Sequence, residues 1–368
     1  MGWYWPGAGC NSLWRPCRST DHLGEARWHR LPRGYPDRRD RWVSVTANCA
    51  SAALEVGEPL AGTAPVATCW VLIEQPGPWG KQALVDSHLD PVLGQILKDR
   101  TEGTGVSVLL VRHPDRLERA TGSDSRNVWI VHTSPGATRM RHGTMSDLTV
   151  IAGWDFTDMA AGALPPFGVS IVAPLLLVCT HSGRDACCAL HGRALITDLL
   201  RSVSAADREF IWESSHIGGH RFAPTVLSLP CGAVFGRLTV DDALAVYSDS
   251  QLSHLPLDNY RGRSCFTHPL QVAEIVVRQS LGIYERDVLD ALRVIDGRPV
   301  PMPVMAALPG VGSSLVAEVR HVDGRAWQVN LRREELAEPR AESCGVEPTK
   351  VFTWRSVGVA AVTPWQLI

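Results

Sequence analysis

The sequence predicts an α/β fold, in which a mixed β-sheet is flanked by helices and is followed by a small α+β region. Between residues 66 and 260, short apolar runs of strand length alternate with segments whose apolar residues recur at helical spacing. This alternation is typical of α/β proteins. Residues 261–368 instead combine a helix with a β-hairpin, which indicates a C-terminal accessory region.

Three strands and one helix are expected in the N-terminal α/β half, residues 46–160. The strands cover residues 66–74, 106–111 and 128–132, which are rich in aliphatic and β-branched side chains. The helix covers residues 84–100. Its expected apolar positions are Leu89, Val92, Ile96 and Leu97.

The loop at residues 75–80, with the sequence Gln-Pro-Gly-Pro-Trp-Gly, follows the first of these strands. We interpret it as a rigid turn with a packed tryptophan. Because α/β proteins place binding loops at the ends of strands, the loop could instead surround a bound group or contact the second half of the protein.

Two further strands begin the second half, residues 161–260. The apolar run 169–178 and the segment 210–212 are interpreted as buried strands, each followed by a polar loop. Residues 189–203 between them have helical spacing, which suits a crossover that connects two strands of one sheet. Both loops would then open at the same end of that sheet. The apolar positions of the crossover helix are Leu190, Ala194, Ile196, Leu199 and Leu200.

A hairpin and a capped helix follow in the second half. Residues 225–229 and 233–238 flank Pro230-Cys231-Gly232, and Cys231 is interpreted as a turn residue rather than a ligand. Thr239, with Asp242 three residues on, forms a capping-box pattern that begins a helix.

The accessory region is expected to contain one helix and a β-hairpin. A helix is expected at residues 269–281, and strands 314–321 and 326–331 flank the turn Asp323-Gly324. The tail that carries Cys344 and Trp354 can add one more strand.

Two cysteines and two histidines follow the strands of the second half. Cys179 and Cys188 lie after the first strand, and His216 and His220 lie after the second in a His-x3-His pattern. Four such ligands on two loops suit a metal ion or an iron–sulfur cluster. A tetrahedral zinc ion accepts the same ligands, so the spacing alone leaves both open, beside a third reading in which the cysteines are buried and unligated.

The neighbours of these residues narrow the choice of ligand. Gly218 and Gly219 lie between the histidines and allow tight loop geometry. Cys187 and Cys188 are adjacent, so their side chains diverge and only one of them is expected to be a ligand. A thiol-dependent enzyme using either of them is the least supported reading, because no Cys-x-x-Cys motif and no neighbouring base accompany them.

Several motifs of this segment resemble the sucrase/ferredoxin-like family. They are Cys179-Thr180-His181, Arg184-Asp185, Cys188, His216-x-Gly218-Gly219-His220 and Gly236-Arg237-Leu238. The resemblance extends upstream through residues 49–90 and weakens after about residue 265. It implies a thioredoxin-like ferredoxin domain. The N-terminal half has an α/β alternation that such a domain could share, so we interpret it as a related α/β unit, and its sequence shows no ligand set of its own.

The same resemblance implies a 2Fe–2S cluster with the ligands Cys179, Cys188, His216 and His220, and it is the reason for preferring Cys188 over Cys187. Neutral imidazoles in place of two thiolates make a cluster easier to reduce. The second ring nitrogen of a histidine ligand can also carry a proton. We therefore expect an electron carrier, rather than a catalyst with its own substrate, that accepts and passes one electron and can couple this to proton transfer.

Five residues near the expected ligands are expected to contact or orient them without binding iron: His181, Arg184, Asp185, Gly218 and Gly219. For His181 the alternative is an exposed loop histidine, and for Arg184 a surface cation. Asp185 is expected to pair with Arg184 or to cap the loop. His191 is interpreted as a solvated helix residue.

Length and composition limit the number of domains, the kinds of partner and the state of the cysteines. The 368 residues suggest about two domains, and residues 1–45, crowded with Arg, Gly, Pro and Trp, are expected to be a disordered extension. A net charge of −2 argues against a nucleic-acid partner. The ten cysteines fit reduced thiols plus a cofactor.

The expected location and partners rest on missing motifs. The N-terminus lacks the apolar core of a signal peptide, and the longest apolar run is too short to span a bilayer, so a cytoplasmic protein without a membrane partner is expected. No nucleotide-phosphate loop is present, so a separate reductase is expected to supply electrons to an unknown acceptor. The alternative function is a zinc-stabilised binding or interaction module without redox activity.

Overall fold

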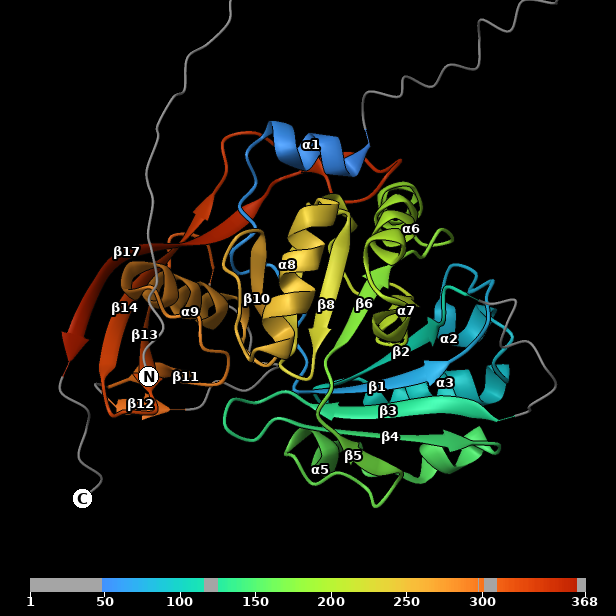
Figure 1. Cartoon of the computed structure of the whole chain (residues 1–368). Coiled ribbons are helices and arrows are strands. Elements are labelled where there is room, and N and C mark those ends of the chain that lie inside the picture. The colour runs from blue at the N-terminus through green and yellow to red at the C-terminus, as the bar shows by residue number, and fades with distance from the viewer. Residues whose placement is uncertain (1–47, 116–124, 297, 301–309, 363–368) are drawn as a thin grey trace, which may run out of the picture. The chain divides into compact units, whose positions relative to one another are not determined.

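The computed structural model describes residues 48–115, 125–296, 298–300 and 310–362. This part of the chain forms a ten-stranded mixed sheet with flanking helices and a five-stranded antiparallel sheet (Figure 1). The predicted α/β fold is therefore confirmed, and the C-terminal region that was expected to be α+β contains the separate five-stranded sheet. The expected extension at residues 1–45 lies outside the described residues.

The ten-stranded sheet has the strand order β10-β9-β8-β6-β7-β2-β1-β3-β4-β5. Its strands are β1 (Cys69–Glu74), β2 (Val106–Arg112), β3 (Arg126–His132), β4 (Arg139–Met145), β5 (Val169–Ile171), β6 (Leu175–Cys179), β7 (Ile211–Ser214), β8 (Thr225–Leu229), β9 (Ala233–Gly236) and β10 (Tyr260–Arg263). Strands from both predicted halves thus hydrogen-bond within one sheet, and the division at residue 160 stays a prediction.

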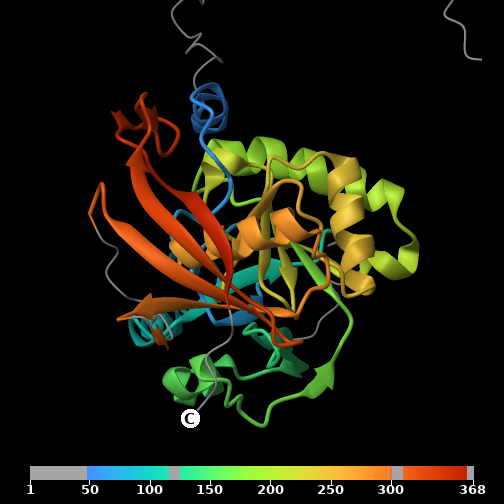
Figure 2. The same cartoon turned by 90° about the vertical axis from the view of Figure 1, so that its left-hand side faces the viewer.

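The five-stranded sheet has the order β12-β11-β13-β14-β17. Its strands are β11 (Leu289–Ile295), β12 (Arg298–Val300), β13 (Ser314–His321), β14 (Ala326–Glu335) and β17 (Phe352–Val362), and a separate two-stranded ribbon joins β15 (Arg340–Ala341) to β16 (Pro348–Thr349). Figure 2 turns this region toward the viewer, with helix α9 against the sheet. The predicted hairpin at Asp323-Gly324 and the added strand containing Trp354 are confirmed.

The described helices are mostly short. They are α1 (Cys49–Glu55), α2 (Ala83–Asp86), α3 (Pro91–Thr101), α5 (Phe156–Ala160), α6 (Arg193–Ser202), α7 (Ala205–Arg208), α8 (Val240–Gln251) and α9 (His268–Leu281), with further single turns η2 (Leu148–Gly153), η3 (Cys188–Gly192) and η4 (His220–Phe222). Within the described residues, we find no helix with the length and apolarity needed to cross a membrane.

One predicted helix is broken in two. Residues 84–100 were expected to be continuous, but the chain leaves α2 and restarts at α3, where Pro91 occupies the first turn and the Asp90 side chain caps the backbone N–H groups of Val92 and Leu93. Proline disfavours a helical residue before it but suits a helix start. Leu89 and Leu97 are buried as expected, but the restart buries Leu93 and leaves the expected Val92 and Ile96 exposed.

The two faces of β6 are covered differently because alternate strand residues point to opposite sides of a sheet. Leu176 and Val178 pack with α6 and α8. Leu175, Leu177 and Cys179 face the other way, into a core that also holds Cys188. Strand alternation therefore places Cys179 on the same side of the sheet as Cys188.

The crossover helix is shifted by a wide turn. The segment η3, which begins at Cys188, is a π-helical turn, and such turns occur often at functional sites. It changes the helical phase, so two expected core residues are exposed, Leu190 (63%) and Ala194. The residues that α6 buries are Leu195, Ile196, Leu199 and Leu200.

The turn and cap predicted after the second histidine are confirmed. Strands β8 and β9 pair as an antiparallel hairpin around Cys231, whose thiol donates to the carbonyl of Ser228. Thr239 and Asp242 form a complete capping box at the start of α8. The positions of β8 and β9 thus follow from local sequence signals.

Candidate metal centres

Two parallel neighbours in the sheet, β6 and β7, carry the predicted ligand loops. The register pairs Cys179 at the end of β6 with Ser214 at the end of β7. The crossover through α6 makes the strands parallel, so both loops leave the same end of the sheet, as predicted.

These loops bring three of the four predicted ligands together. Cys179, Cys188 and His216 each offer one ligand atom, and these atoms all lie within 4.8 Å of one another. Both cysteines are buried, and His216 is half-buried. His220 adjoins this set, with its Nδ1 atom 3.4 Å from Nε2 of His216. We refer to the four residues as the Cys2His2 group.

The hydrogen bonds of the two histidines leave nitrogen atoms unused. Nδ1 of His216 is buried and has no hydrogen-bond partner, and Nε2 of the same ring lies 3.4 Å from Nδ1 of His220. Buried polar atoms are usually satisfied. A bound metal would take up one of these nitrogens, and 3.4 Å is about the separation of two nitrogen ligands on one tetrahedral metal ion with bonds of about 2.0–2.1 Å.

His220 is held in one tautomer by its other neighbour. Its Nε2 atom lies 2.5 Å from the carbonyl oxygen of Glu342. A carbonyl can only accept, so Nε2 carries the proton and Nδ1 keeps its lone pair. The lone pair faces His216, which is the arrangement that a metal-ligating histidine requires.

A hydrogen bond between the two thiols of the Cys2His2 group shifts their pKa values in opposite directions. The hydrogen bond from Cys188 lowers the pKa of Cys179 well below its usual range, against the opposing effect of burial, and His216 lowers it further. The same contact, together with burial, raises the pKa of Cys188. Burial lowers the pKa of His220, although Asp185 opposes this. A thiolate beside a neutral imidazole is the protonation state that binds metal ions.

His181 supports the loop that carries His216 and His220 through a hydrogen bond to its backbone. It is buried, so the alternative of an exposed loop residue is wrong. Its Nε2 atom donates to the carbonyl of Gly80 at 2.8 Å, and its Nδ1 atom accepts the backbone N–H of His216 at 3.2 Å. Trp79 packs edge-on against the ring at 5.8 Å. The loop at residues 75–80 is therefore part of the surroundings of the Cys2His2 group.

The two glycines between the histidines are required by the backbone and by a buried arginine. Gly218 and Gly219 have φ values of 112° and 75°. A Cβ atom on Gly219 would lie 2.3 Å from Nη2 of Arg261. That guanidinium is buried and donates to the carbonyl of Gly218 at 2.9 Å. Arg261 thus supports the loop in a conformation that only glycine adopts readily.

The other residues that were considered near the expected ligands lie in different environments. Arg184 is exposed and fits the surface-cation reading, and His191 is half-buried rather than fully solvated. Asp185 is buried and caps its own loop by accepting the backbone N–H of Cys187 at 2.8 Å. Cys187 points away from Cys188, as their adjacency predicted.

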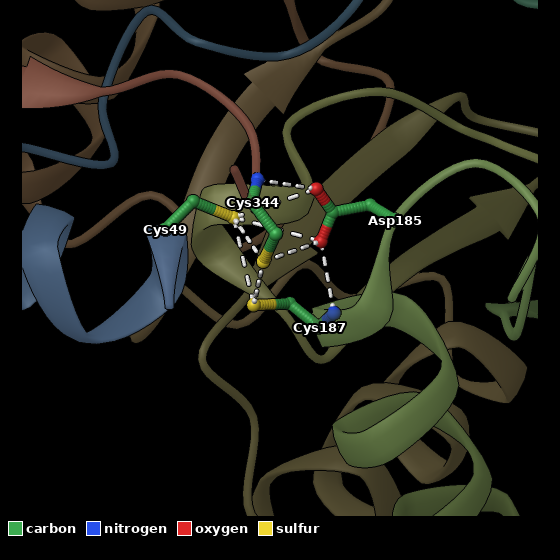
Figure 3. Close-up of side chains that lie close together, drawn as sticks. All are labelled: Cys49, Asp185, Cys187 and Cys344. Carbon is green, nitrogen blue, oxygen red and sulfur yellow. Dashed lines mark hydrogen bonds between the residues drawn. The ribbon is translucent and has the colours of Figure 1, made fainter. Parts of the chain in front are cut away.

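Cys187 and Asp185 belong to a second group, drawn in Figure 3. Its members are Cys49, Asp185, Cys187 and Cys344, whose ligand atoms also lie within 4.8 Å of one another. The sulfur of Cys187 lies 3.5 Å from that of Cys49 and 3.4 Å from that of Cys344. We refer to these residues as the Cys3Asp group. Both groups are of a kind that could hold a metal ion.

Hydrogen bonds shape the charge of the Cys3Asp group. Burial raises the pKa of Asp185, but donors from Cys344, Cys187 and Ser343 outweigh it and lower the value to about 2. The thiol of Cys49 lowers the pKa of Cys187 to about 7, and the same contact raises the pKa of Cys49. The group therefore contains a carboxylate and one readily ionised thiol.

Sequence reasoning missed Cys49 and Cys344 as site residues. They lie 295 positions apart and belong to no motif. The available signals were the high cysteine count and the adjacency of Cys187 to an expected ligand, which left one thiol without a role.

The fold and these two groups define an α/β protein with candidate metal centres built from thiols, imidazoles and one carboxylate. The family model described as Sucrase/ferredoxin-like matches residues 60–262. Since this is more than half of the chain, the protein belongs to that family. No curated protein and no solved structure matches it.

Proposed function

We propose that this protein transfers electrons through a 2Fe–2S cluster held by the Cys2His2 group. The observation that carries the proposal is the convergence of Cys179, Cys188 and His216 within 4.8 Å, with His220 3.4 Å from His216. Two thiolates and two imidazoles are a known ligand set of 2Fe–2S centres. When bound, the cluster would supply one-electron chemistry, accepting one electron and passing it on.

The arrangement of the four ligands supports a cluster over one ion. Around a single tetrahedral zinc ion, all ligand atoms would lie about 3.3–3.8 Å apart, given bonds of about 2.0–2.3 Å. Among the described residues, His220 falls outside the set in which every pair is within 4.8 Å. A site with two metal ions is longer than a site with one, and it can take His220 as a ligand next to His216, which lies 3.4 Å away.

The histidine ligands also support coupling to protons. Nε2 of His220 carries a proton and donates it to the carbonyl of Glu342. An imidazole that loses this proton would become a stronger donor to iron, so the redox state and the protonation state of His220 would affect each other. Two neutral ligands in place of thiolates would also raise the reduction potential.

The surface near His216 supports a partner that carries negative charge. His216 and His181 line a pocket of about 220 Å³. The same pocket is lined by Lys81, Lys98 and Arg184, whose side chains are exposed. A cationic rim favours the approach of an acidic surface. We therefore propose that a separate reductase or the electron acceptor binds here.

The alternative is a zinc-stabilised interaction module. One observation favours it: Cys179, Cys188 and His216 already form a compact set of three ligands, as many as a single zinc ion takes from the protein in an open site. In this case the group would stabilise the fold and would not change redox state.

The visible absorption spectrum separates the two proposals. The protein is purified without oxygen, its iron, acid-labile sulfide and zinc are quantified, and spectra are recorded before and after dithionite. Bands that bleach on reduction, with two iron and two sulfide per chain, are the expected result. A colourless protein without iron, with zinc on the Cys2His2 group, would overturn the electron-transfer proposal.

A further inference from the structure

We infer that the Cys3Asp group is a second metal site, separate from the Cys2His2 group, and that it holds one structural zinc ion. Its ligands are Cys49 on α1, Asp185 and Cys187 on the loop after β6, and Cys344 beyond β15 (Figure 3). The site would hold its ion whether the Cys2His2 group carries an iron–sulfur cluster or nothing.

The distances match a tetrahedron. The three sulfur–sulfur separations are 3.5, 3.4 and 3.7 Å. Oδ1 of Asp185 lies 3.6 Å from the sulfur of Cys49 and 3.3 Å from that of Cys344. With zinc–sulfur bonds of about 2.3 Å and zinc–oxygen bonds of about 2.0–2.2 Å, a tetrahedral site has sulfur–sulfur edges of about 3.8 Å and sulfur–oxygen edges of about 3.5 Å.

The carboxylate is oriented as a ligand would be. Oδ2 of Asp185 accepts the hydroxyl of Ser343 at 2.8 Å and the backbone N–H of Cys344 at 2.9 Å. Oδ1 faces the sulfurs and accepts only one backbone N–H, that of Cys187 at 2.8 Å. Metal-binding carboxylates are commonly held in this way by hydrogen bonds from outside the site.

The donor set selects the kind of ion. Three thiolates exclude calcium and magnesium, which take oxygen ligands, and favour zinc. Cys49 and Cys187 are 0% and 1% exposed, so four protein ligands would close the site, as in structural rather than catalytic zinc centres. A disulfide is a poorer account, because it would use two of the three thiols and leave the third, and the carboxylate beside it, unexplained.

The site would join three segments that are distant in sequence. Cys49 lies 136 positions before Asp185, and Cys344 lies 159 positions after it. Helix α1 has 7 residues, which is too short to be stable alone. A buried ion pair between Glu58 and Arg340, with oxygen–nitrogen distances of 2.5 and 2.7 Å, ties the same two outer segments together.

The ion would also act on the Cys2His2 group. The C-terminal segment that supplies Cys344 supplies the carbonyl of Glu342, which accepts the proton of His220. Holding Cys344 therefore holds the acceptor that sets the tautomer of His220. Zinc here is a positioning element for that histidine, not a redox partner.

Metal analysis of the full-length protein tests the inference. Zinc and iron are measured by mass spectrometry in wild type, in Cys49→Ser/Cys344→Ser and in Cys179→Ser. We expect one zinc per chain in wild type, at least a tenfold loss of zinc with iron retained in the double variant, and zinc retained in Cys179→Ser. Cys231→Ser, a buried cysteine outside both groups, is the control and keeps both metals.

The inference is overturned if the double variant folds and keeps its zinc, if wild type has no zinc, or if iron occupies this site. Should the double variant fail to fold, X-ray absorption at the zinc edge of the wild type decides. We expect three sulfur ligands at about 2.3 Å and one oxygen at about 2.0–2.2 Å. Two sulfurs and two nitrogens would place zinc in the Cys2His2 group and overturn the inference, and so would a disulfide among the three thiols detected by mass spectrometry.

Discussion

Asp185 and His220 lie 3.7 Å apart, measured from the carboxylate Oδ2 to Nε2 of the imidazole, and this contact connects the two candidate metal groups. Asp185 belongs to the Cys3Asp group and His220 to the Cys2His2 group. The adjacent residues Cys187 and Cys188 form a second connection, because each belongs to one group. A charge placed in one group is therefore felt in the other across two short paths.

The two adjacent cysteines should differ sharply on substitution. Cys188 faces Cys179 and His216, whereas Cys187 faces Cys49 and Cys344. We expect Cys188→Ser to lose iron and visible absorption, and Cys187→Ser to retain both. Iron content and the visible spectrum of the two variants, prepared in parallel, check this. The reverse pattern would mean that Cys187 is the cluster ligand.

Replacing both histidines by cysteine should lower the reduction potential. Four thiolates make a cluster more negative than two thiolates and two imidazoles do, so His216→Cys/His220→Cys should hold a cluster that is harder to reduce. The expected decrease is on the order of 300 mV. Dye-coupled titration of wild type and variant measures it. An unchanged potential in a variant that still carries the cluster would show that the histidines are not ligands.

Gly219→Ala should disturb the histidine loop more than an ordinary strained glycine would. Its Cβ atom would lie 2.3 Å from the buried guanidinium of Arg261, so overpacking adds about 1–3 kcal/mol to the backbone strain. Gly324→Ala is the control, because Gly324 also has a positive φ, 95°, but no atom within 4 Å of the added Cβ. Urea unfolding and iron content compare the two. Equal losses would contradict a packing role for Arg261.

Removing one partner of the ion pair between Glu58 and Arg340 should destabilise the fold strongly. Both residues are 3% exposed, and Glu58 also accepts from Arg221 at 2.9 Å. Glu58→Gln leaves buried guanidinium charge uncompensated, and the expected loss in the free energy of unfolding is about 3–5 kcal/mol.

The matched control for this loss is an exposed ion pair. Asp198→Asn removes a surface partner of Arg201, where the side chains are 53% and 74% exposed, and should cost less than about 1 kcal/mol. Denaturant titrations of both variants supply the comparison. Similar small losses in the two variants would refute a stabilising role for the buried pair.

Stability should fall in acid partly through Asp287. Burial alone would raise the pKa of this carboxyl, but Arg263 and Arg286 lower it below its ordinary value, with contacts of 2.9 and 3.1 Å. Its contribution is therefore present above the unfolded pKa of about 3.9 and is lost as the pH falls through the lower folded pKa. Urea unfolding over this range should show a flatter profile for Asp287→Asn than for wild type, and parallel profiles would contradict the assignment.

Local sequence patterns determined much of the region around the Cys2His2 group. Apolar runs and a helical crossover predicted that β6 and β7 are parallel neighbours, but the run 169–178, expected to be one buried strand, is divided between the edge strand β5 and the buried strand β6. The turn at Cys231 and the cap at Thr239 predicted the elements that follow. These features depend on residues close together in sequence, where periodicity, capping and turn chemistry act directly. The convergence of the ligand loops followed from topology.

The tertiary structure decided what depends on residues far apart. The break at Pro91 and the wide turn after Cys188 changed which helix residues are buried, and the packing of His181 against Gly80 decided between the expected supporting role and the alternative of an exposed side chain. The Cys3Asp group is the extreme case, since Cys49 and Cys344 approach each other only when α1 and the C-terminal segment pack on the loop after β6. The periodicity of a short segment cannot predict such a contact. The contact arises from the folding of the whole chain rather than from local backbone preference.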